Sequence, residues 1–150
     1  MDHGIKAAEY FLQGYNCAQA IAVAFSDVTG LNTDASAQMI SSFGGGMGRL
    51  REVCGAVSGM FFVAGCLYGY HDPKDDKAKM QHYTLVQYLA EQFRKEAGSI
   101  VCRELLQNPS ADPTPTPRTE EFYRQRPCAR YVVLAGRILD DYIAQHPIVR

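Results

Sequence analysis

The apolar residues of this chain recur every three or four positions along nearly its whole length, which is the spacing of one face of an α-helix. No stretch of strand length alternates convincingly between apolar and polar residues. The clearest stripe runs from about Lys74 to Ala97, with Pro73 just before it and Gly98 just after it. The spacing therefore predicts an all-α fold.

We expect six or seven helices packed as one single-domain bundle over residues 1–150, because a chain of this length can bury one sizeable core. The expected helices, with approximate bounds, are Ile5–Gln13, Cys17–Val28, Asp34–Phe43, Leu50 or Arg51 to Leu67, Lys74–Ala97, Ser99–Gln107 and Pro127–Gln145, with a further turn at Thr119–Arg124. Four prolines between Asn108 and Arg118 predict an extended loop near 108–118, which we expect to wrap the surface.

Charge and hydropathy argue against several classes of function. The composition is 47% hydrophobic and 21% charged, and the formal net charge of -1 gives no electrostatic case for nucleic acid or an anionic membrane. The first residues lack the apolar stretch of an export signal, and the longest apolar run, near Val57–Tyr70, is too short and glycine-rich to span a bilayer. We therefore expect a cytoplasmic protein without nucleic-acid or membrane partners.

Five cysteines are the most distinctive chemical groups of the chain. In a reducing cytoplasm they predict metal or redox chemistry rather than structural disulfides. Four of them fall in the first turn of an expected helix, namely Cys17, Cys54, Cys102 and Cys128. Unpaired N–H groups and a partial positive charge favour a thiolate at such a position. The fifth, Cys66, lies inside an apolar segment and is expected to pack in the core.

Cys54 opens the run Cys54-Gly55-Ala56-Val57-Ser58-Gly59, in which Gly55 and Gly59 are about one helical turn apart. Small residues at this spacing let another backbone or a ligand approach closely. Two interpretations stay open, and they are compatible. In one, Gly55 and Gly59 admit a cofactor at the cysteine site. In the other, they serve ordinary helix–helix packing.

The glycine-rich segment Gly44–Gly48 leads towards Cys54 and is expected to provide mobility or a tight entry of the chain. It lacks the Lys-Ser/Thr pair that completes a phosphate-binding loop, so it does not indicate nucleotide binding. Arg49 and Arg51 follow it, where they either stabilise a thiolate or remain solvated on the surface. The four histidines form no ligand-like pair, and no Ser-His-Asp arrangement is readable.

The order of Cys17, then Cys54-Gly55-Ala56-x-x-Gly59, then Cys102 and Cys128 resembles the C_GCAxxG_C_C family, whose members are described as redox-active. The segment Gly14–Ala20 is also similar to the first cysteine region of that family. The resemblance covers essentially the whole chain. It implies a redox role and supplies no established reaction, and Cys66 lies outside its cysteine pattern.

Two redox mechanisms suit the four cysteines Cys17, Cys54, Cys102 and Cys128. They can hold an iron–sulfur cluster, which takes Cys₄ ligation. Alternatively, Cys54 attacks a substrate disulfide and a second cysteine resolves the product. The cluster uses all four thiols and exchange needs only two, so the sequence slightly favours metal or cluster binding. Either mechanism requires the sulfurs to share one pocket.

Two other classes of function remain open at this stage. One is a helical domain with a structural Cys₄ zinc site and no catalysis. The other is a small-molecule or protein binding module in which the cysteines are buried free thiols. For a redox role the partner would be an unidentified redox protein or a small thiol, and the glycine-rich helix faces are compatible with a homodimer. The sequence does not decide whether the protein is an enzyme.

Overall fold

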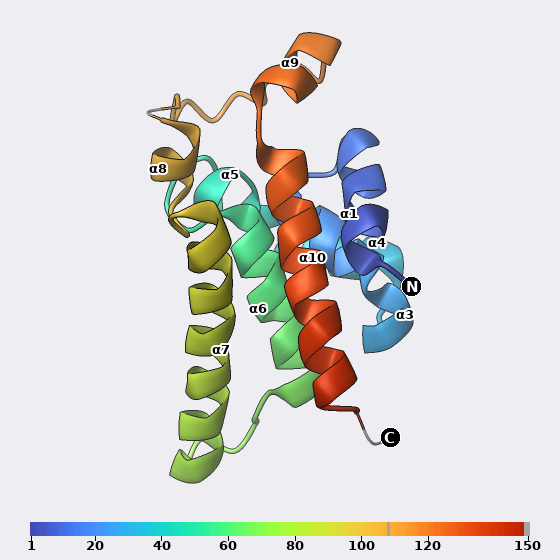
Figure 1. Cartoon of the computed structure of the whole chain (residues 1–150), viewed down its shortest axis with the longest axis vertical. Helices are drawn as coiled ribbons and strands as arrows, with labels where there is room; N and C mark the ends of the chain where they lie inside the picture. The colour runs from blue at the N-terminus through green and yellow to red at the C-terminus, as the bar shows by residue number, and fades with distance from the viewer. Residues whose placement is uncertain (108, 149–150) are drawn as a thin grey trace.

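The computed structural model describes residues 1–107 and 109–148, and this part of the chain is all-α, as the apolar spacing predicts (Figure 1). Its longer helices are α1 (His3–Leu12), α2 (Cys17–Ala24), α4 (Thr33–Ile40), α6 (Gly55–Tyr68), α7 (Asp76–Ala97) and α10 (Cys128–Gln145). Shorter elements are α3 (Ser26–Thr29), the 3-10 helix η1 (Ser41–Phe43), α5 (Gly44–Met47), α8 (Cys102–Leu106) and α9 (Glu120–Gln125). The six longer helices agree with the six or seven expected.

Helix α6 is the centre of the bundle, with α2, α7 and α10 packed around it, and α1 packs on both α2 and α10 (Figure 1). The largest fully buried side chains of the core include Phe11, Phe25, Phe93, Met60 and Leu139. Burying each of them contributes roughly 1.5–3 kcal/mol. None of the helices within the described residues is long and apolar enough to cross a membrane.

Several helix ends follow the capping residues seen in the sequence. Asn16 begins α2 with a capping box, because its side chain accepts from the Gln19 amide and the Gln19 side chain accepts from the Asn16 amide. Gly30 and Gly98 end α3 and α7 in the left-handed conformation that glycine adopts without steric cost. The helix expected over Cys17–Val28 is divided at Phe25 into α2 and α3.

The start of α6 is the largest departure from the expected boundaries. The helix begins at Gly55, not at Leu50 or Arg51. An isolated antiparallel bridge between Val53 and Val101 precedes it. In this bridge the Cys54 amide donates to the Ile100 carbonyl at 2.7 Å and the Cys102 amide donates to the Glu52 carbonyl at 2.6 Å. A pairing between such distant segments leaves no periodic pattern in the sequence, so the spacing could not reveal it.

The proline-rich loop is extended over residues 109–118, as predicted, and Asn108, its expected first residue, lies outside the described residues. The loop lies against the glycine segment through two arginines. The Arg51 Nε donates to the Ser110 carbonyl at 2.9 Å, and the Arg49 Nε donates to the Asp112 carbonyl at 2.6 Å. It therefore covers the end of the bundle at which α6 and α10 begin.

The expectation that Cys66 packs in the core is wrong, because this residue is exposed. Helix α6 is apolar on nearly every side, so its sequence does not distinguish the buried face from the exposed one. The buried face contains Val57, Met60 and Val63, whereas Gly65 and Cys66 face outward.

Candidate functional site

Four cysteines stand where four helices begin. Cys17, Cys102 and Cys128 are the first residues of α2, α8 and α10, and Cys54 is the N-cap of α6. The prediction that these cysteines occupy helix starts is therefore confirmed. The beginnings of α6, α8 and α10 lie at the same end of the molecule, the upper end in Figure 1.

The structure brings the four thiols together. Cys17 interacts electrostatically with each of the other three, and Cys54, Cys102 and Cys128 also interact with one another. All are free thiols. Cys66 lies on the exposed side of α6 and its pKa is raised by burial alone, with no contribution from another cysteine. The four helix-start cysteines thus form one cluster, and the fifth lies outside it.

Cys17 and Cys128 interact more strongly with each other than with Cys54 or Cys102. The Cys17 thiol hydrogen-bonds to the Cys128 sulfur, and this bond is the main reason why the pKa of Cys128 falls from 9.0 to about 7. Burial opposes the shift, while the charges of Arg126, Arg118 and Arg51 support it. The same hydrogen bond, with burial, raises the pKa of Cys17 well above its ordinary value. The two shifts have opposite directions, so they favour a thiolate at Cys128 beside a neutral thiol at Cys17.

Cys54 is held as a neutral thiol. Burial raises its pKa to about 12, although the backbone amides of Ala56 and Val57 face the sulfur and oppose the rise. The amides do not complete a side-chain cap of α6. Burial in an apolar environment therefore outweighs the favourable position at a helix start. These shifts favour Cys128 over Cys54 as the thiolate.

Cys102 is also buried, and burial raises its pKa. The guanidinium of Arg51 opposes this rise by donating from Nη1 to the Cys102 sulfur across 3.7 Å. Cys54 and Cys102 are diagonal neighbours across the Val53–Val101 bridge described above. Cys54 and Cys102 thus form a second pair of buried thiols.

A cavity of about 430 Å³ opens onto the cluster, and Cys17 and Cys128 line it. Its other walls come from the glycine segment, the prolines of the extended loop and the rings of Phe11 and Phe122. Cys54 and Cys102 do not line the cavity. A small molecule entering it would meet the Cys17–Cys128 pair first, and its volume is within the range of small-ligand sites.

Gly55 and Gly59 make their close approach to α2. A Cβ atom on Gly55 would lie 3.1 Å from the Cys17 Cβ, and one on Gly59 would lie 2.8 Å from the Ile21 Cβ. Atoms of the protein itself therefore fill the space beside both glycines, and neither glycine lines the cavity. Of the two interpretations left open by the sequence, these contacts favour helix packing, which sets α2 and its Cys17 against α6.

The glycine segment forms a left-handed turn that carries arginines to the cavity. Positive φ angles of 61° to 70° run from Gly45 through Arg49, and Arg51 follows at 63°. Such angles suit glycine, while for Met47, Arg49 and Arg51 they cost roughly 1–2 kcal/mol each. A Cβ on Gly46 would lie 2.7 Å from the Cys102 Cβ, so the turn packs directly on the cluster. Strain at this point is compensated by the surrounding contacts.

Four arginines line the same cavity, namely Arg49, Arg51, Arg118 and Arg126. The sequence indicated the first two by their place beside Cys54 and missed the other two. Arg126 is two residues before Cys128, and this spacing was a visible signal. Arg118 carried no local signal, because it reaches the site by stacking on Phe11 and Phe122.

The four cysteines of the cluster are also the metal ligands that the sequence predicts. Among the described residues, no group of three or more His, Cys, Asp or Glu side chains is placed to hold a metal ion. All four predicted ligands, Cys17, Cys54, Cys102 and Cys128, are within this part of the chain. The zinc and iron–sulfur sites considered from the sequence therefore stay predictions, and the thiol chemistry of these residues needs no metal.

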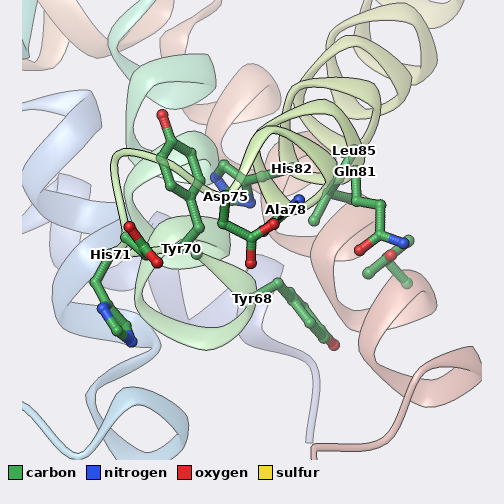
Figure 2. A pocket seen from close by; sticks show the side chains of 11 residues that line it. Tyr68, Tyr70, His71, Asp75, Ala78, Gln81, His82 and Leu85 are labelled. Atoms are coloured by element: carbon green, nitrogen blue, oxygen red, sulfur yellow. Dashed lines mark hydrogen bonds between the residues drawn. The ribbon is translucent and has the colours of Figure 1, made fainter.

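A second cavity, of about 510 Å³, lies where α6 ends and α7 begins (Figure 2). Tyr68, Tyr70 and His82 line it, with the Tyr70 ring edge-on to the His82 ring. None of the cysteines lines this cavity. It lies at the end of the bundle opposite the thiol cluster, so it takes no part in thiol chemistry at that cluster.

The chain matches a family of known proteins. A family model described as "Putative redox-active protein (C_GCAxxG_C_C)" matches residues 15–142, a span that includes the whole thiol cluster. Comparison with curated proteins and with solved structures found no match.

Proposed function

The chain belongs to the C_GCAxxG_C_C family, which is described as redox-active, and from this premise we propose that it exchanges thiols and disulfides through Cys128 and Cys17. The observation that carries the proposal is the thiolate–thiol pair in the cavity wall, with the pKa of Cys128 at about 7. A thiolate is the attacking species in disulfide exchange, and an attacking thiol works best when its pKa is near the ambient pH.

In the first step the Cys128 thiolate attacks one sulfur of a substrate disulfide. A Cys128–substrate disulfide forms, the substrate S–S bond breaks, and the first product leaves as a thiolate. Cys17 loses its hydrogen-bond acceptor once the Cys128 sulfur is no longer an anion. The Cys17 proton can then pass to the leaving thiolate, which gives the first product thiol.

In the second step the Cys17 thiolate attacks the Cys128 sulfur. A Cys17–Cys128 disulfide forms, and the second product leaves as a thiolate that takes a proton from water. The substrate disulfide gains two electrons and the protein loses them. A small thiol or dithiol reverses these steps and returns the protein to its reduced form.

Cys54 and Cys102 have a different place in this scheme. Both are buried and neither lines the cavity, and burial raises the pKa of each. The sequence favoured Cys54 as the attacking thiol on the strength of its glycine neighbours, whereas the proposal assigns attack to Cys128. Cys54 and Cys102 remain protonated near neutral pH and do not compete for the substrate.

The Cys17→Ser variant tests this assignment, because it removes the resolving thiol and leaves the attacking one. Mixed with hydroxyethyl disulfide in a Cys66→Ser background, it should accumulate a mixed disulfide at Cys128, detected by peptide mass spectrometry. The parent protein should instead pass to a Cys17–Cys128 disulfide. A mixed disulfide located mainly on Cys54 would contradict the assignment.

Metal content gives a separate check. We expect the protein purified without oxygen to be colourless and to contain much less than one zinc or iron per chain by elemental analysis, because no group of three or more donor side chains among the described residues is placed to hold a metal ion. Cys54→Ser is the informative comparison, since it removes one predicted ligand and keeps the Cys17–Cys128 pair. Stoichiometric metal in the parent that is lost in this variant would replace thiol exchange by a metal-centred function.

A further inference from the structure

The cavity beside Cys128 has a strong positive charge that the proposed thiol chemistry does not by itself require. Four arginine side chains line it and no aspartate or glutamate does. Among the described residues, none of these four guanidinium groups has a carboxylate within 4.0 Å, and the ion pairs formed by arginine there involve Arg94, Arg103 and Arg137. These four charges exceed the single negative charge that a Cys128 thiolate supplies, and clustered like charges are unfavourable.

Arg51 is the most informative of these side chains. It is only 4% exposed, yet its Nη2 atom has no hydrogen-bond partner among the described residues. Its other two nitrogens each make a hydrogen bond, since Nε donates to the Ser110 carbonyl and Nη1 to the Cys102 sulfur. A buried charged donor without a partner is unfavourable, and it is the kind of group that a ligand satisfies.

Arg126 supplies a second available group. Among the described residues its guanidinium contacts the Phe122 ring, 5.3 Å away, and forms no hydrogen bond or ion pair there. Arg118 differs, because it donates to the carbonyls of Phe11 and Tyr15 and its role is structural. Arg49 is held by the proline-rich loop, and the charges of Arg51 and Arg126, after burial, lower its pKa. Arg51 and Arg126 are therefore the two arginines with guanidinium donors available to a ligand.

We infer that this cavity binds small disulfides that carry an anionic group, with Arg51 and Arg126 as the donors to that group and Cys128 placed to attack the S–S bond. This inference rests on the proposed thiol–disulfide exchange and names its substrate class. The guanidinium fork matches a carboxylate in two parallel hydrogen bonds, which makes the recognition specific for charge and shape. The rings of Phe11 and Phe122 and the prolines line the rest of the cavity and can pack on a short aliphatic chain.

Three disulfides of similar size and different charge test the substrate class: dithiodipropionate is a dianion, hydroxyethyl disulfide is neutral and cystamine is a dication. Each disulfide is reacted with the Cys66→Ser protein at low salt, and the rate at which Cys128 is modified is measured. This rate is divided by the rate at which the same disulfide reacts with free mercaptoethanol, which corrects for the intrinsic reactivity of the disulfide. We expect the corrected rate to be about tenfold to hundredfold higher for the dianion than for the dication, as one or two charge-assisted hydrogen bonds imply. Equal corrected rates would overturn the inference.

The Arg126→Gln variant should reduce this preference about tenfold. Arg124→Gln is the matched control, because Arg124 is exposed on α9, does not line the cavity and carries the same charge. A change in the pKa of Cys128 alters all three rates alike, so the ratio of rates reports substrate charge alone. Arg51→Gln should have the larger effect, and Arg126→Gln keeps the test valid if the buried Arg51 variant does not fold.

Suberate separates this inference from the proposed function. It has the chain length and charge of dithiodipropionate and no S–S bond, so its binding needs no redox chemistry. We expect it to protect Cys128 from iodoacetamide in the parent and in Arg124→Gln, and much less in Arg126→Gln. If suberate protects Cys128 from iodoacetamide but no disulfide reacts at Cys128, the proposed function is contradicted and the anion site is supported. If disulfides react at Cys128 without any preference for the dianion, and suberate gives no protection, the anion site is contradicted and the proposed function is supported.

Discussion

Alkylation of Cys128 by iodoacetamide should rise with pH through a midpoint near 7, about two pH units below the ordinary cysteine value of 9.0. The pKa of Cys128 is lowered from 9.0 to about 7, so its thiolate is present above pH 7 and is lost as the pH falls below it. At pH 7 about half of Cys128 is thiolate, against about 1% for a thiol with its pKa at 9. The alkylation rate rises by less than the thiolate fraction does, because the nucleophilicity of a thiolate falls with its pKa. The pH midpoint of alkylation is therefore the proper measurement.

The Cys17→Ala variant identifies the cause of this shift. The hydrogen bond from Cys17 is the largest contribution to it, ahead of the charges of Arg126, Arg118 and Arg51. Removing the donor should therefore raise the midpoint of Cys128 alkylation towards 9. Cys54→Ser is the matched control, since it removes a buried thiol that does not hydrogen-bond to Cys128, and its midpoint should stay near 7. A parent midpoint near 9, or no change in Cys17→Ala, would show that the pair is not formed as described.

The positions of the cysteines along the helices were predictable because they depend on local signals. Asn16 in a capping box places Cys17 at the first residue of α2, and Pro127 does the same for Cys128 at the start of α10. These signals act within a few residues, so the helix starts can be predicted without knowledge of the tertiary fold. The all-α class followed from apolar spacing for the same reason.

The pairing of the cysteines was not predictable, because it depends on contacts between distant segments. Cys17 meets Cys128 only because α2 and α10 pack in one bundle, and Cys54 meets Cys102 through the Val53–Val101 bridge. The preference for Cys54 rested on Gly55 and Gly59. Those glycines report the approach of α2, and the burial that comes with that packing is what raises the pKa of Cys54. The sequence alone does not show whether a small residue admits a ligand or a neighbouring helix.

Packing between α1 and α10 gives the largest expected effect on stability. Gly136 of α10 faces Gly4 of α1, and a Cβ on Gly136 would lie 2.5 Å from the Gly4 Cα and 2.7 Å from the Gly4 nitrogen. These are backbone atoms, which cannot rotate away as a flexible side chain can. Gly136→Ala must therefore push α1 from α10 and loosen the buried Ala7 and Phe11. We expect a loss of about 3 kcal/mol in the free energy of unfolding, at the upper end for overpacking.

Gly65→Ala is the matched control for this variant, because it makes the same change inside a helix where a Cβ would meet no atom within 4 Å. Replacing glycine by alanine in a helix adds about 1 kcal/mol when the space is open. The two variants should therefore move the urea midpoint in opposite directions at a constant slope. Helix propensity also favours alanine at Gly136, so a loss of stability there can come only from the contact with α1. Equal midpoints for the two variants would mean that α1 and α10 do not approach this closely.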